Sequence, residues 1–314
     1  MQFPLSIGCK RMCIFAIVFF AMGRLPIQAL EIDRQYGEAS FKFLKLPLSP
    51  RIVGLGGAGT ALADGAGELD LNPAAPASDS GHLVVGRGYP FSEFQSTSSL
   101  ITWSLPSSGY RILINARYLG FDNIPGYDEI ARPTTPYGAH TLKAQAGLAG
   151  MFRQLAWGTT VNFAGNSIAD ANYATAMINA GVRYRILTGL HAGLSIINAD
   201  FWDSQAMVAG NQDPFPPTAV QAGLAYSHAI GSSLIASLAA DARSRNDEQL
   251  AWPMGAELIW RNAIIARVGF PLGEQEPGIA AGLGLHWSRF QFQYAYQSHA
   301  TLGPGHFWTL DIAY

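Results

Sequence analysis

The segment Gly54 to Gly59 has the spacing of a phosphate-binding loop, GxGxxG. In a dinucleotide site, such glycines let the backbone approach a pyrophosphate at the start of a helix. That chemistry needs a strand before the loop, a helix after it and a βαβ unit around both. Gly65, Gly67 and Pro73 interrupt any following helix, and no βαβ pattern appears downstream. We therefore interpret these glycines as sites of tight backbone packing and expect no cofactor.

Other catalytic patterns are missing from the sequence. It contains no GxSxG, HExxH, CxxC or Walker motif. His191, His286 and His306 are candidates for rim chemistry by residue type alone, and a lone histidine on a strand more often makes a structural hydrogen bond. We predict that the protein is not an enzyme, with no catalytic, cofactor-binding or metal-binding residues.

The N-terminus has the features of an export signal. Lys10 and Arg11 precede a short apolar run, Met12 to Met22, and a small residue, Ala29, follows. This order predicts a signal peptide over residues 1–29, cleaved after Ala29. An uncleaved anchor is the alternative, but the run is shorter than the roughly 20 apolar residues of a spanning helix. Both cysteines of the chain lie in this segment, so the mature chain would lack thiols.

The composition favours a surface that faces lipid. Charged residues make up 13% of the chain, about half of what a soluble domain usually carries, while hydrophobic residues reach 49%. The net charge of −2 gives no indication of a nucleic-acid partner. A soluble all-β protein with a large core is the alternative, but its solvent face would normally carry more charge.

Residues 30–81 break every regular period. The stretch from Phe41 to Ala77 is rich in glycine, alanine and proline. Irregular backbone of this kind is tolerated at membrane depth where protein surrounds it. We expect these residues to plug the lumen of a barrel, with Asn72 and Pro73 forming a turn that locks the plug; a movable gate is the alternative. The plug motif consists of Gly54, Gly56, Gly57, Gly59, Asp64, Asn72, Pro73 and Ala74.

Residues 82–314 alternate with period two. In Tyr110 to Leu119 the even positions are apolar or aromatic, while the odd positions include Arg111, Asn115 and Arg117. Successive side chains of a strand point to opposite faces, so one face is apolar and the other polar. The pattern repeats in segments of about 10 residues, the length of a tilted strand that crosses a bilayer. We predict an all-β, antiparallel transmembrane barrel of about 14 strands.

Connections between these segments alternate in length. Short turns occur at Gly189 and at Gly231–Ser232, and we expect long loops at Asp122 to Tyr137 and Asp203 to Pro217. Short turns on one side and long loops on the other are typical of outer-membrane barrels.

The last strand resembles the C-terminal signal that the barrel insertion machinery reads. The chain ends on an aromatic residue, and alternate positions before it are apolar or aromatic. The residues of this predicted signal are Trp308, Leu310, Ile312 and Tyr314.

The plug stretch and the closing hairpin resemble the PorV/PorQ family, which is related to FadL-type transporters. The matching elements are Phe43-Leu44, Ser49-Pro50-Arg51, Gly54 to Gly59, Ala63-Asp64, Asn72-Pro73-Ala74 and Leu302 to Tyr314. This resemblance implies a barrel of 14 strands in the bacterial outer membrane with its N-terminal segment inside. It also implies one of two functions: service to the type IX secretion system, receiving the C-terminal domains of cargo proteins, or passage of hydrophobic small molecules.

The predicted inner face favours the first of these functions. It carries several cations, whereas a route for apolar ligands is usually lined by apolar and aromatic groups. These cations are Arg111, Arg117, Lys143, Arg183, Arg185, Arg243 and Arg261. We therefore expect an accessory protein for protein transport, with outer-membrane lipids, insertion machinery and secretion components as partners. A FadL-like transporter is the alternative, and an open porin would share the polar face.

Overall fold

The structure is a computed structural model. It describes residues 41–75, 81–91, 96–107, 109–128, 130–169, 171–200, 215–273 and 278–314. The predicted signal peptide, residues 30–40 and 76–80 of the predicted plug, and most of the predicted loop at 203–217 lie outside these residues.

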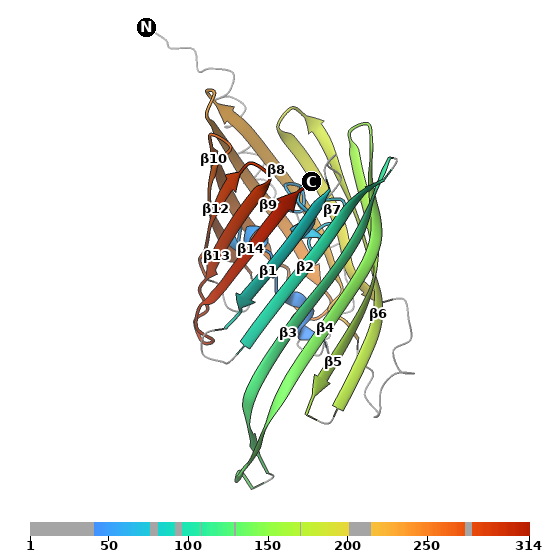
Figure 1. Cartoon of the computed structure of the whole chain (residues 1–314), viewed down its shortest axis with the longest axis vertical. Coiled ribbons are helices and arrows are strands. Elements are labelled where there is room, and N and C mark those ends of the chain that lie inside the picture. The colour runs from blue at the N-terminus through green and yellow to red at the C-terminus, as the bar shows by residue number, and fades with distance from the viewer. Residues whose placement is uncertain are drawn as a thin grey trace. The chain divides into compact units, whose positions relative to one another are not determined.

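Fourteen antiparallel strands close into a barrel in which each strand pairs with its neighbours in the chain (Figure 1). The last strand closes the cylinder against the first, with His82 opposite Ala313 and Tyr89 opposite His306. Closure leaves no unpaired sheet edge in the wall. The predicted fold class is therefore confirmed. The strands are β1 (His82–Tyr89), β2 (Ser96–Ser107), β3 (Tyr110–Tyr127), β4 (Pro133–Phe152), β5 (Leu155–Ile168), β6 (Ala171–Leu187), β7 (Leu190–Asp200), β8 (Ala219–Ile230), β9 (Leu234–Arg245), β10 (Trp252–Trp260), β11 (Ile264–Leu272), β12 (Ala280–Trp287), β13 (Phe290–Gln297) and β14 (Gly305–Ala313).

The two faces of the wall follow the alternation of the sequence. On β3, Ile112 and Ile114 are more than 40% exposed, whereas Arg111 and Arg117, at alternate positions before and after them, are buried. On β12, Leu283 is 60% exposed. The outer surface therefore consists of apolar side chains suited to lipid, and the polar side chains point into the lumen.

The ends of the barrel differ. The connections from β2, β4, β6, β8, β10 and β12 to the following strand have at most three residues, and they lie at the end that holds Gly81 and Tyr314. The other connections are mostly longer. Because outer-membrane barrels keep short turns in the periplasm, the short-turn end is periplasmic and the opposite end faces outside.

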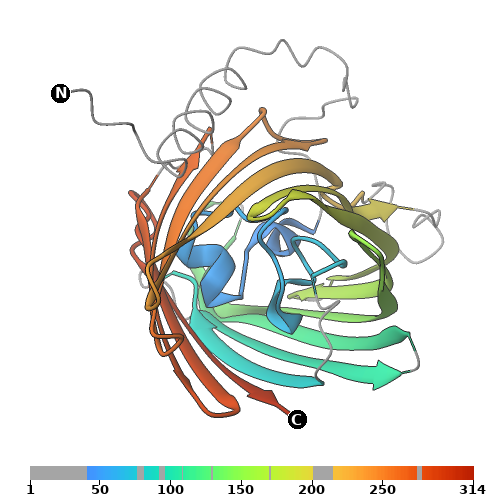
Figure 2. The same ribbon diagram turned by 90° about the horizontal axis from the view of Figure 1, so that it is seen from above.

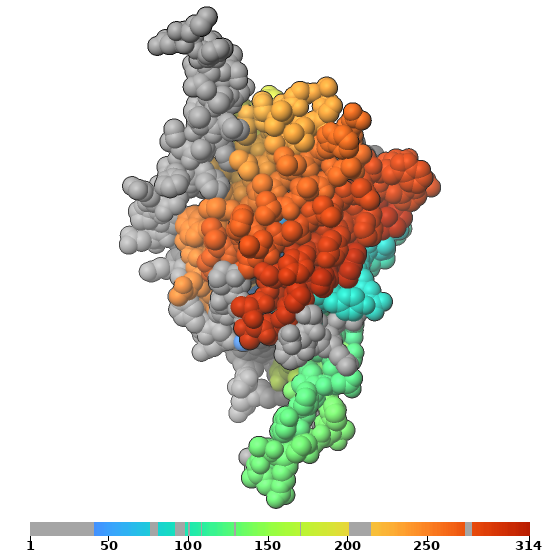
Figure 3. All heavy atoms as spheres, turned by 90° about the vertical axis from the view of Figure 1, so that its left-hand side faces the viewer, coloured from blue at the N-terminus to red at the C-terminus, as the bar shows by residue number. Residues whose placement is uncertain are grey.

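One hairpin, β3–β4, extends far beyond its neighbours at the outer end (Figures 1 and 3). Pairing with β2 stops at Phe121 and pairing with β5 stops at Ala139, so within residues 122–138 the strands β3 and β4 pair only with each other, as a two-stranded ribbon. The expected loop at Asp122 to Tyr137 is therefore wrong. Its prolines suggested a loop, but a ribbon with both edges open does not need a backbone donor at every position.

The residues from Phe41 to Ala75 lie inside the barrel (Figure 2). They form a short 3₁₀ turn, η1 (Lys42–Lys45), one helical turn, α2 (Pro50–Gly54), and a second 3₁₀ turn, η2 (Ala66–Glu68). Pro50 opens α2 at a position where its missing N–H is not needed. No helix among the described residues is long and apolar enough to cross a membrane.

Candidate functional site

The plug glycines let the plug backbone touch the wall. Gly56, Gly57 and Gly59 have φ values of 65°, 85° and 127°, which residues with a Cβ rarely adopt. A Cβ on Gly56 would lie 2.5 Å from the backbone nitrogen of Phe270 on β11. A Cβ on Gly54 would lie 3.1 Å from the Cα of Gly282. The segment thus seats the plug against β11 and β12 and does not form a nucleotide site.

Inward-facing glycines of the wall complement the plug. A Cβ on Gly269 would overlap the backbone of Leu55 and Gly56, one on Gly158 would overlap Pro73, and one on Gly193 would overlap Thr60. Sequence reasoning missed this role. The signal was present, since glycines recur on the polar face of successive strands.

Asn72 and its neighbours form a turn against β6. The side chain of Asn72 accepts a hydrogen bond from the backbone of Ala74 at 3.0 Å and donates to the carbonyls of Thr60 and Val182. The carbonyl of Pro73 lies against Gly158 of β5. Asn72 thus ties two parts of the plug to each other and to the wall.

A charge network fixes α2 to the wall. Arg51 donates two hydrogen bonds to Glu257 of β10, at 3.1 and 3.0 Å, and Glu257 also accepts one from Arg267 at 2.6 Å. Arg51 also pairs with Asp64 and Glu68 of the plug. Asp64 keeps an exposed side chain, whereas Glu68 and Glu257 are buried. Bidentate contacts of this kind between an arginine and a carboxylate fix the relative orientation of the two groups as well as attracting them.

A second anchor lies at Asp241 of β9. One of its oxygens accepts hydrogen bonds from the backbone of Gly59 at 2.9 Å and from the backbone and hydroxyl of Thr60 at 2.8 and 2.7 Å. Asp241 thus binds the end of the glycine-rich segment through two backbone N–H groups and one hydroxyl.

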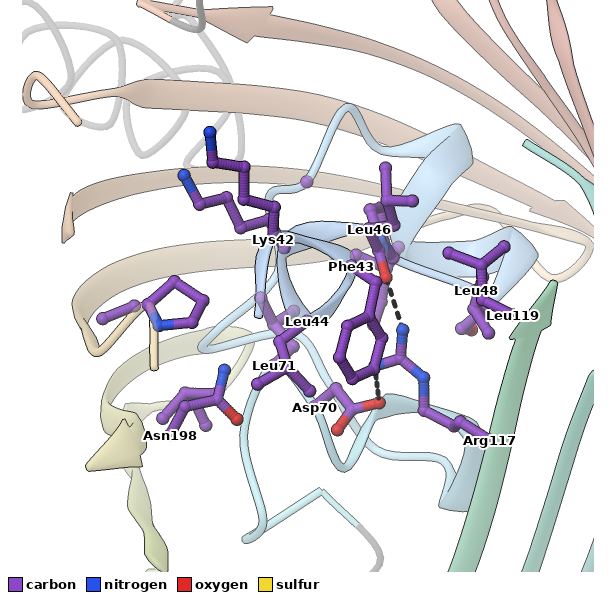
Figure 4. Close-up of a pocket in the computed structure, with 18 of the residues that line it drawn as sticks. Lys42, Phe43, Leu44, Leu46, Leu48, Asp70, Leu71, Arg117, Leu119 and Asn198 are labelled. Atoms are coloured by element: carbon purple, nitrogen blue, oxygen red, sulfur yellow. Dashed lines mark hydrogen bonds and ion pairs between the residues drawn. The ribbon is translucent and has the colours of Figure 1, made fainter. Parts of the chain in front are cut away.

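The outer mouth contains a cavity of about 460 Å³ between the plug and the wall (Figure 4). Most of its lining is apolar, and cations lie around it. The apolar lining includes Phe43, Leu44, Leu46, Leu48, Leu71, Phe91, Leu119, Phe121, Ile197 and Leu302, and the cations include Lys42, Lys45, Arg117, Arg243 and Arg245. We call this cavity the outer vestibule.

The floor of the outer vestibule is a buried ion cluster (Figure 4). Asp70 of the plug pairs with Arg117 of β3 and with Lys143 of β4, the latter at 2.7 Å. Arg117 also donates a hydrogen bond of 2.6 Å to the carbonyl of Leu46. The cluster thus ties the plug to β3 and β4 at this side of the cavity.

The rim of the outer vestibule is tied to the plug by Lys45. This lysine pairs with Asp247 and Glu248 in the connection between β9 and β10, the latter at 2.9 Å. Burial would raise the pKa of Glu248, but Arg245 and Lys45 outweigh it and lower that pKa to about 2. The carboxylate is therefore ionised at neutral pH and holds η1 near the mouth.

The predicted inner cations divide into two groups. Arg117 and Lys143 hold Asp70, Arg183 donates to the carbonyl of Ala63, and Arg111 and Arg243 are buried. Arg185 lies on the same face of β6 as Arg183, near the end of the strand, where its side chain is exposed. The assignment of Arg261 to the inner face is wrong, because the alternation of β10 ends at Trp260 and Arg261 occupies the turn that follows.

The histidine candidates do not form one site. His191, His286 and His306 lie on β7, β12 and β14. His286 contacts the carbonyl of Asn262, and His306 contacts the hydroxyl of Tyr294 at 2.8 Å. Within the described ranges, no three His, Cys, Asp or Glu side chains gather as metal ligands would.

The C-terminal strand pairs with both β13 and β1. Trp308 contacts the ring of Tyr89 on β1, with centroids 5.8 Å apart, while Leu310 and Ile312 lie on the same outward face. Tyr314 accepts a hydrogen bond of 2.6 Å from the indole of Trp103, and its backbone pairs with Gly81. The terminal residue thus closes the seam at the periplasmic end.

No family model matches the sequence, and no curated protein matches it. Solved structures do match the fold. The toluene transporter TbuX of Ralstonia pickettii aligns with a TM-score of 0.59 at 11% identity, covering 85% of this chain and 97% of TbuX. The toluene transporter TodX of Pseudomonas putida aligns with a TM-score of 0.57 at 9% identity, covering 90% of this chain and 98% of TodX.

These identities are too low to transfer a substrate, but they support the fold. TbuX and TodX are toluene transporters. The similarity extends over most of both chains at the level of architecture. The protein is a bacterial outer-membrane barrel of 14 strands whose fold is similar to those of TbuX and TodX.

Proposed function

We propose that this barrel transports hydrophobic small molecules, which it first binds in the outer vestibule. The observation that carries the proposal is the cavity itself, about 460 Å³ in volume, open at the mouth and lined mainly by apolar side chains. Pockets of this size and character are typical of small-molecule sites. The similarity of the fold to those of TbuX and TodX, which are toluene transporters, supports the same function.

The polar inner face no longer argues against this function. Sequence reasoning counted the inward cations as the lining of a route, but Arg117, Lys143 and Arg183 make their contacts to the plug. A ligand in the outer vestibule would instead meet Phe43, Leu119 and their apolar neighbours. Arg117 thus has a second role, because it anchors the plug and also lines the outer vestibule beside these apolar side chains.

The mechanism we infer is a two-step passage. An apolar molecule enters the outer vestibule and displaces water from its walls, which is favourable in proportion to the apolar area covered. It then leaves past the ion cluster of Asp70, Arg117 and Lys143, which blocks the way in this conformation. Passage therefore requires part of the plug to shift, so the same segment that is locked by Asn72 also serves as the gate.

The test is uptake in a deletion strain that carries either the natural protein or a cavity variant. Leu119 is 3% exposed and lines the outer vestibule, so Leu119→Trp should fill the cavity. The matched control is Leu142→Trp, because Leu142 is 54% exposed on the outer face of the neighbouring strand. We expect the first variant to lose accumulation of a labelled hydrophobic compound and the second to retain it. Equal loss in both variants, at equal amounts of folded protein, would contradict the proposal.

A secretion role of the PorV/PorQ type is the second candidate. The observation that favours it is the ribbon 122–138, whose strand edges are unpaired and whose tip exposes Tyr127 and Ile130 by 64% and 66%. Open strand edges are surfaces to which an extended segment of another protein can add. The same deletion strain separates the two functions. Loss of secreted cargo with normal uptake would support the secretion role, and normal secretion with impaired uptake would support transport.

A further inference from the structure

Three of the short periplasmic turns carry an arginine that lies over an outward-facing aromatic ring. The guanidinium carbon lies 5.4 Å from the ring centre in Arg153 and Phe152, 4.8 Å in Arg261 and Trp260, and 5.2 Å in Arg289 and Phe290. The turns join β4 to β5, β10 to β11 and β12 to β13. We call Arg153, Arg261 and Arg289 the rim arginines.

The rim arginines lie where lipid tails give way to headgroups. Phe152 and Trp260 are 65% and 45% exposed and end the apolar outer faces of their strands. Aromatic residues in such girdles mark the membrane interface. An arginine one residue further on, with its stem along the ring, places its charge at headgroup level.

The charged side chains of the short turns are all positive. No aspartate or glutamate occurs in the segments 106–110, 152–155, 187–190, 230–234, 260–264 and 287–290 that form the short turns. Within the part of the chain that the structure describes, none of the rim arginines takes part in an ion pair. Carboxylates occur at the other end at Asp122, Asp128, Asp247 and Glu248, and those on the periplasmic side, Asp64 and Asp311, are paired inside the lumen with Arg51 and His82.

Turn geometry does not explain the choice of arginine. Arg153 and Arg261 have φ values of 56° and 51°, in the left-handed region where glycine or asparagine is usual. In the third turn the left-handed residue is Ser288 and not Arg289. The turns therefore accept other residue types at this position, and their geometry does not require an arginine beside each aromatic ring.

We propose that the rim arginines bind the headgroups of anionic phospholipids in the inner leaflet of the outer membrane. A guanidinium donates paired hydrogen bonds to phosphate oxygens, and the adjacent ring packs against the upper part of the acyl chains. Net negative lipids are favoured over zwitterionic ones because the short turns that carry these cations contain no aspartate or glutamate. This role is independent of what the barrel transports.

The test measures lipid retention by native mass spectrometry of the purified full chain. Phosphatidylglycerol and phosphatidylcholine with identical acyl chains are added separately. We expect the natural protein to retain phosphatidylglycerol preferentially, and Arg261→Gln to weaken that binding about fivefold. The triple variant Arg153→Gln/Arg261→Gln/Arg289→Gln should lose the preference.

Two further variants keep the test specific. Arg87 lies over Tyr89 at 5.6 Å, with the same local chemistry but at the outer end of β1, so Arg87→Gln is the control and should retain the preference. Arg261→Gly relieves the left-handed turn, so it should fold at least as well as the natural protein and still lose lipid. Unchanged retention in the triple variant, or equal loss in Arg87→Gln and Arg261→Gln, would overturn the proposal.

Discussion

At the scale of single residues, close packing at glycines positions the plug as much as charged side chains do. Inward glycines on several strands leave room for the backbone of the plug, and each ion pair is then placed within reach of its partner. Gly269 has Leu55 and Gly56 directly against its Cα, so its contact is backbone to backbone. Because backbone cannot rotate away from an added methyl group, a substitution at this position is a sensitive test of how closely the plug packs against the wall.

We expect Gly269→Ala to destabilise the folded protein by about 1–3 kcal/mol, as overpacking of a filled interior does. The control is Gly165→Ala on β5, where an added Cβ would have no neighbour nearer than 4.0 Å. Urea unfolding of both variants in lipid vesicles measures the difference, and limited proteolysis of the plug reports its seating. An unchanged midpoint for Gly269→Ala would mean that the plug does not press on β11.

Sequence could predict the face on which a residue lies but not its partner. The alternation around Tyr110 placed Arg111 and Arg117 inward correctly. That Arg117 would meet Asp70, 47 positions away, depends on closure of the whole barrel around the plug. Arg261 shows the limit of periodicity, because alternation does not reveal where a strand ends and its turn begins.

At the scale of elements, η1 is held at the mouth by an acid-sensitive contact. The pKa of Glu248 in the folded state, about 2, lies below its ordinary value of 4.5 because Lys45 and Arg245 outweigh the effect of burial. The ionised carboxylate therefore stabilises the folded state fully above about pH 4.5, and this stabilisation is lost as the pH falls toward about 2.

We expect Glu248→Gln to lower the free energy of unfolding at pH 7 by about 1–3 kcal/mol, as for a hydrogen bond between charged groups. Near pH 2 the variant and the natural protein should nearly converge, since most of this stabilisation is lost by the time the pH reaches the folded-state pKa. Urea titrations at the two pH values provide the measurement. A difference that is the same at both pH values would show that the charge of Glu248 does not hold η1.

The last strand has two separable properties, an aromatic end and a hydrogen bond. Tyr314→Phe removes only the contacts of its hydroxyl with Trp103 and with the carbonyl of Ser104, whereas Tyr314→Ala also removes the ring. If the insertion machinery reads the aromatic terminus, the first variant should reach the outer membrane in normal amounts and the second should fall several-fold. The heat-modifiable band of membrane fractions measures the folded amount. Equal loss in both variants would assign the effect to the hydrogen bond.

The ribbon is the element that sequence reasoning misjudged. Pro125, Pro133 and Pro136 lie within it, and proline is a strong signal against a central strand. In an isolated two-stranded ribbon both strands are edge strands, so a proline there does not argue against a strand. The pairing of Tyr127 with Pro133 depends on two strands that leave the barrel together, which local sequence does not encode.

At the scale of the whole molecule, the outer surface has one apolar band of even height. Outward apolar residues cover about nine positions on β3, β5 and β11 alike, although the lengths of these strands are 18, 14 and 9 residues. Nine residues at ~3.3 Å each, tilted by ~40°, span ~23 Å, close to the apolar band of an outer-membrane barrel. The extra length of β3 and β4 therefore lies beyond the membrane.

This placement predicts where a charge is costly. Leu283→Arg, in the middle of the band, should destabilise folding into vesicles by about 2–4 kcal/mol. Thr135→Arg, at an exposed position of the ribbon, should have almost no effect. Unfolding titrations of the two variants measure both free energies. Comparable losses would mean that the ribbon is embedded, or that the band does not face lipid.

Orientation is the property on which both the outer vestibule and the rim arginines depend. If the ribbon is extracellular and the short turns are periplasmic, Thr135→Cys should react with a membrane-impermeant maleimide in intact cells. Ser288→Cys, in the turn between β12 and β13, should react only after the outer membrane is permeabilised. The natural chain is the background control, because its two cysteines, Cys9 and Cys13, lie in the predicted signal peptide. Labelling of position 288 in intact cells would show that the barrel has the opposite orientation. The cavity would then face the periplasm, and the rim arginines would lie away from the inner leaflet.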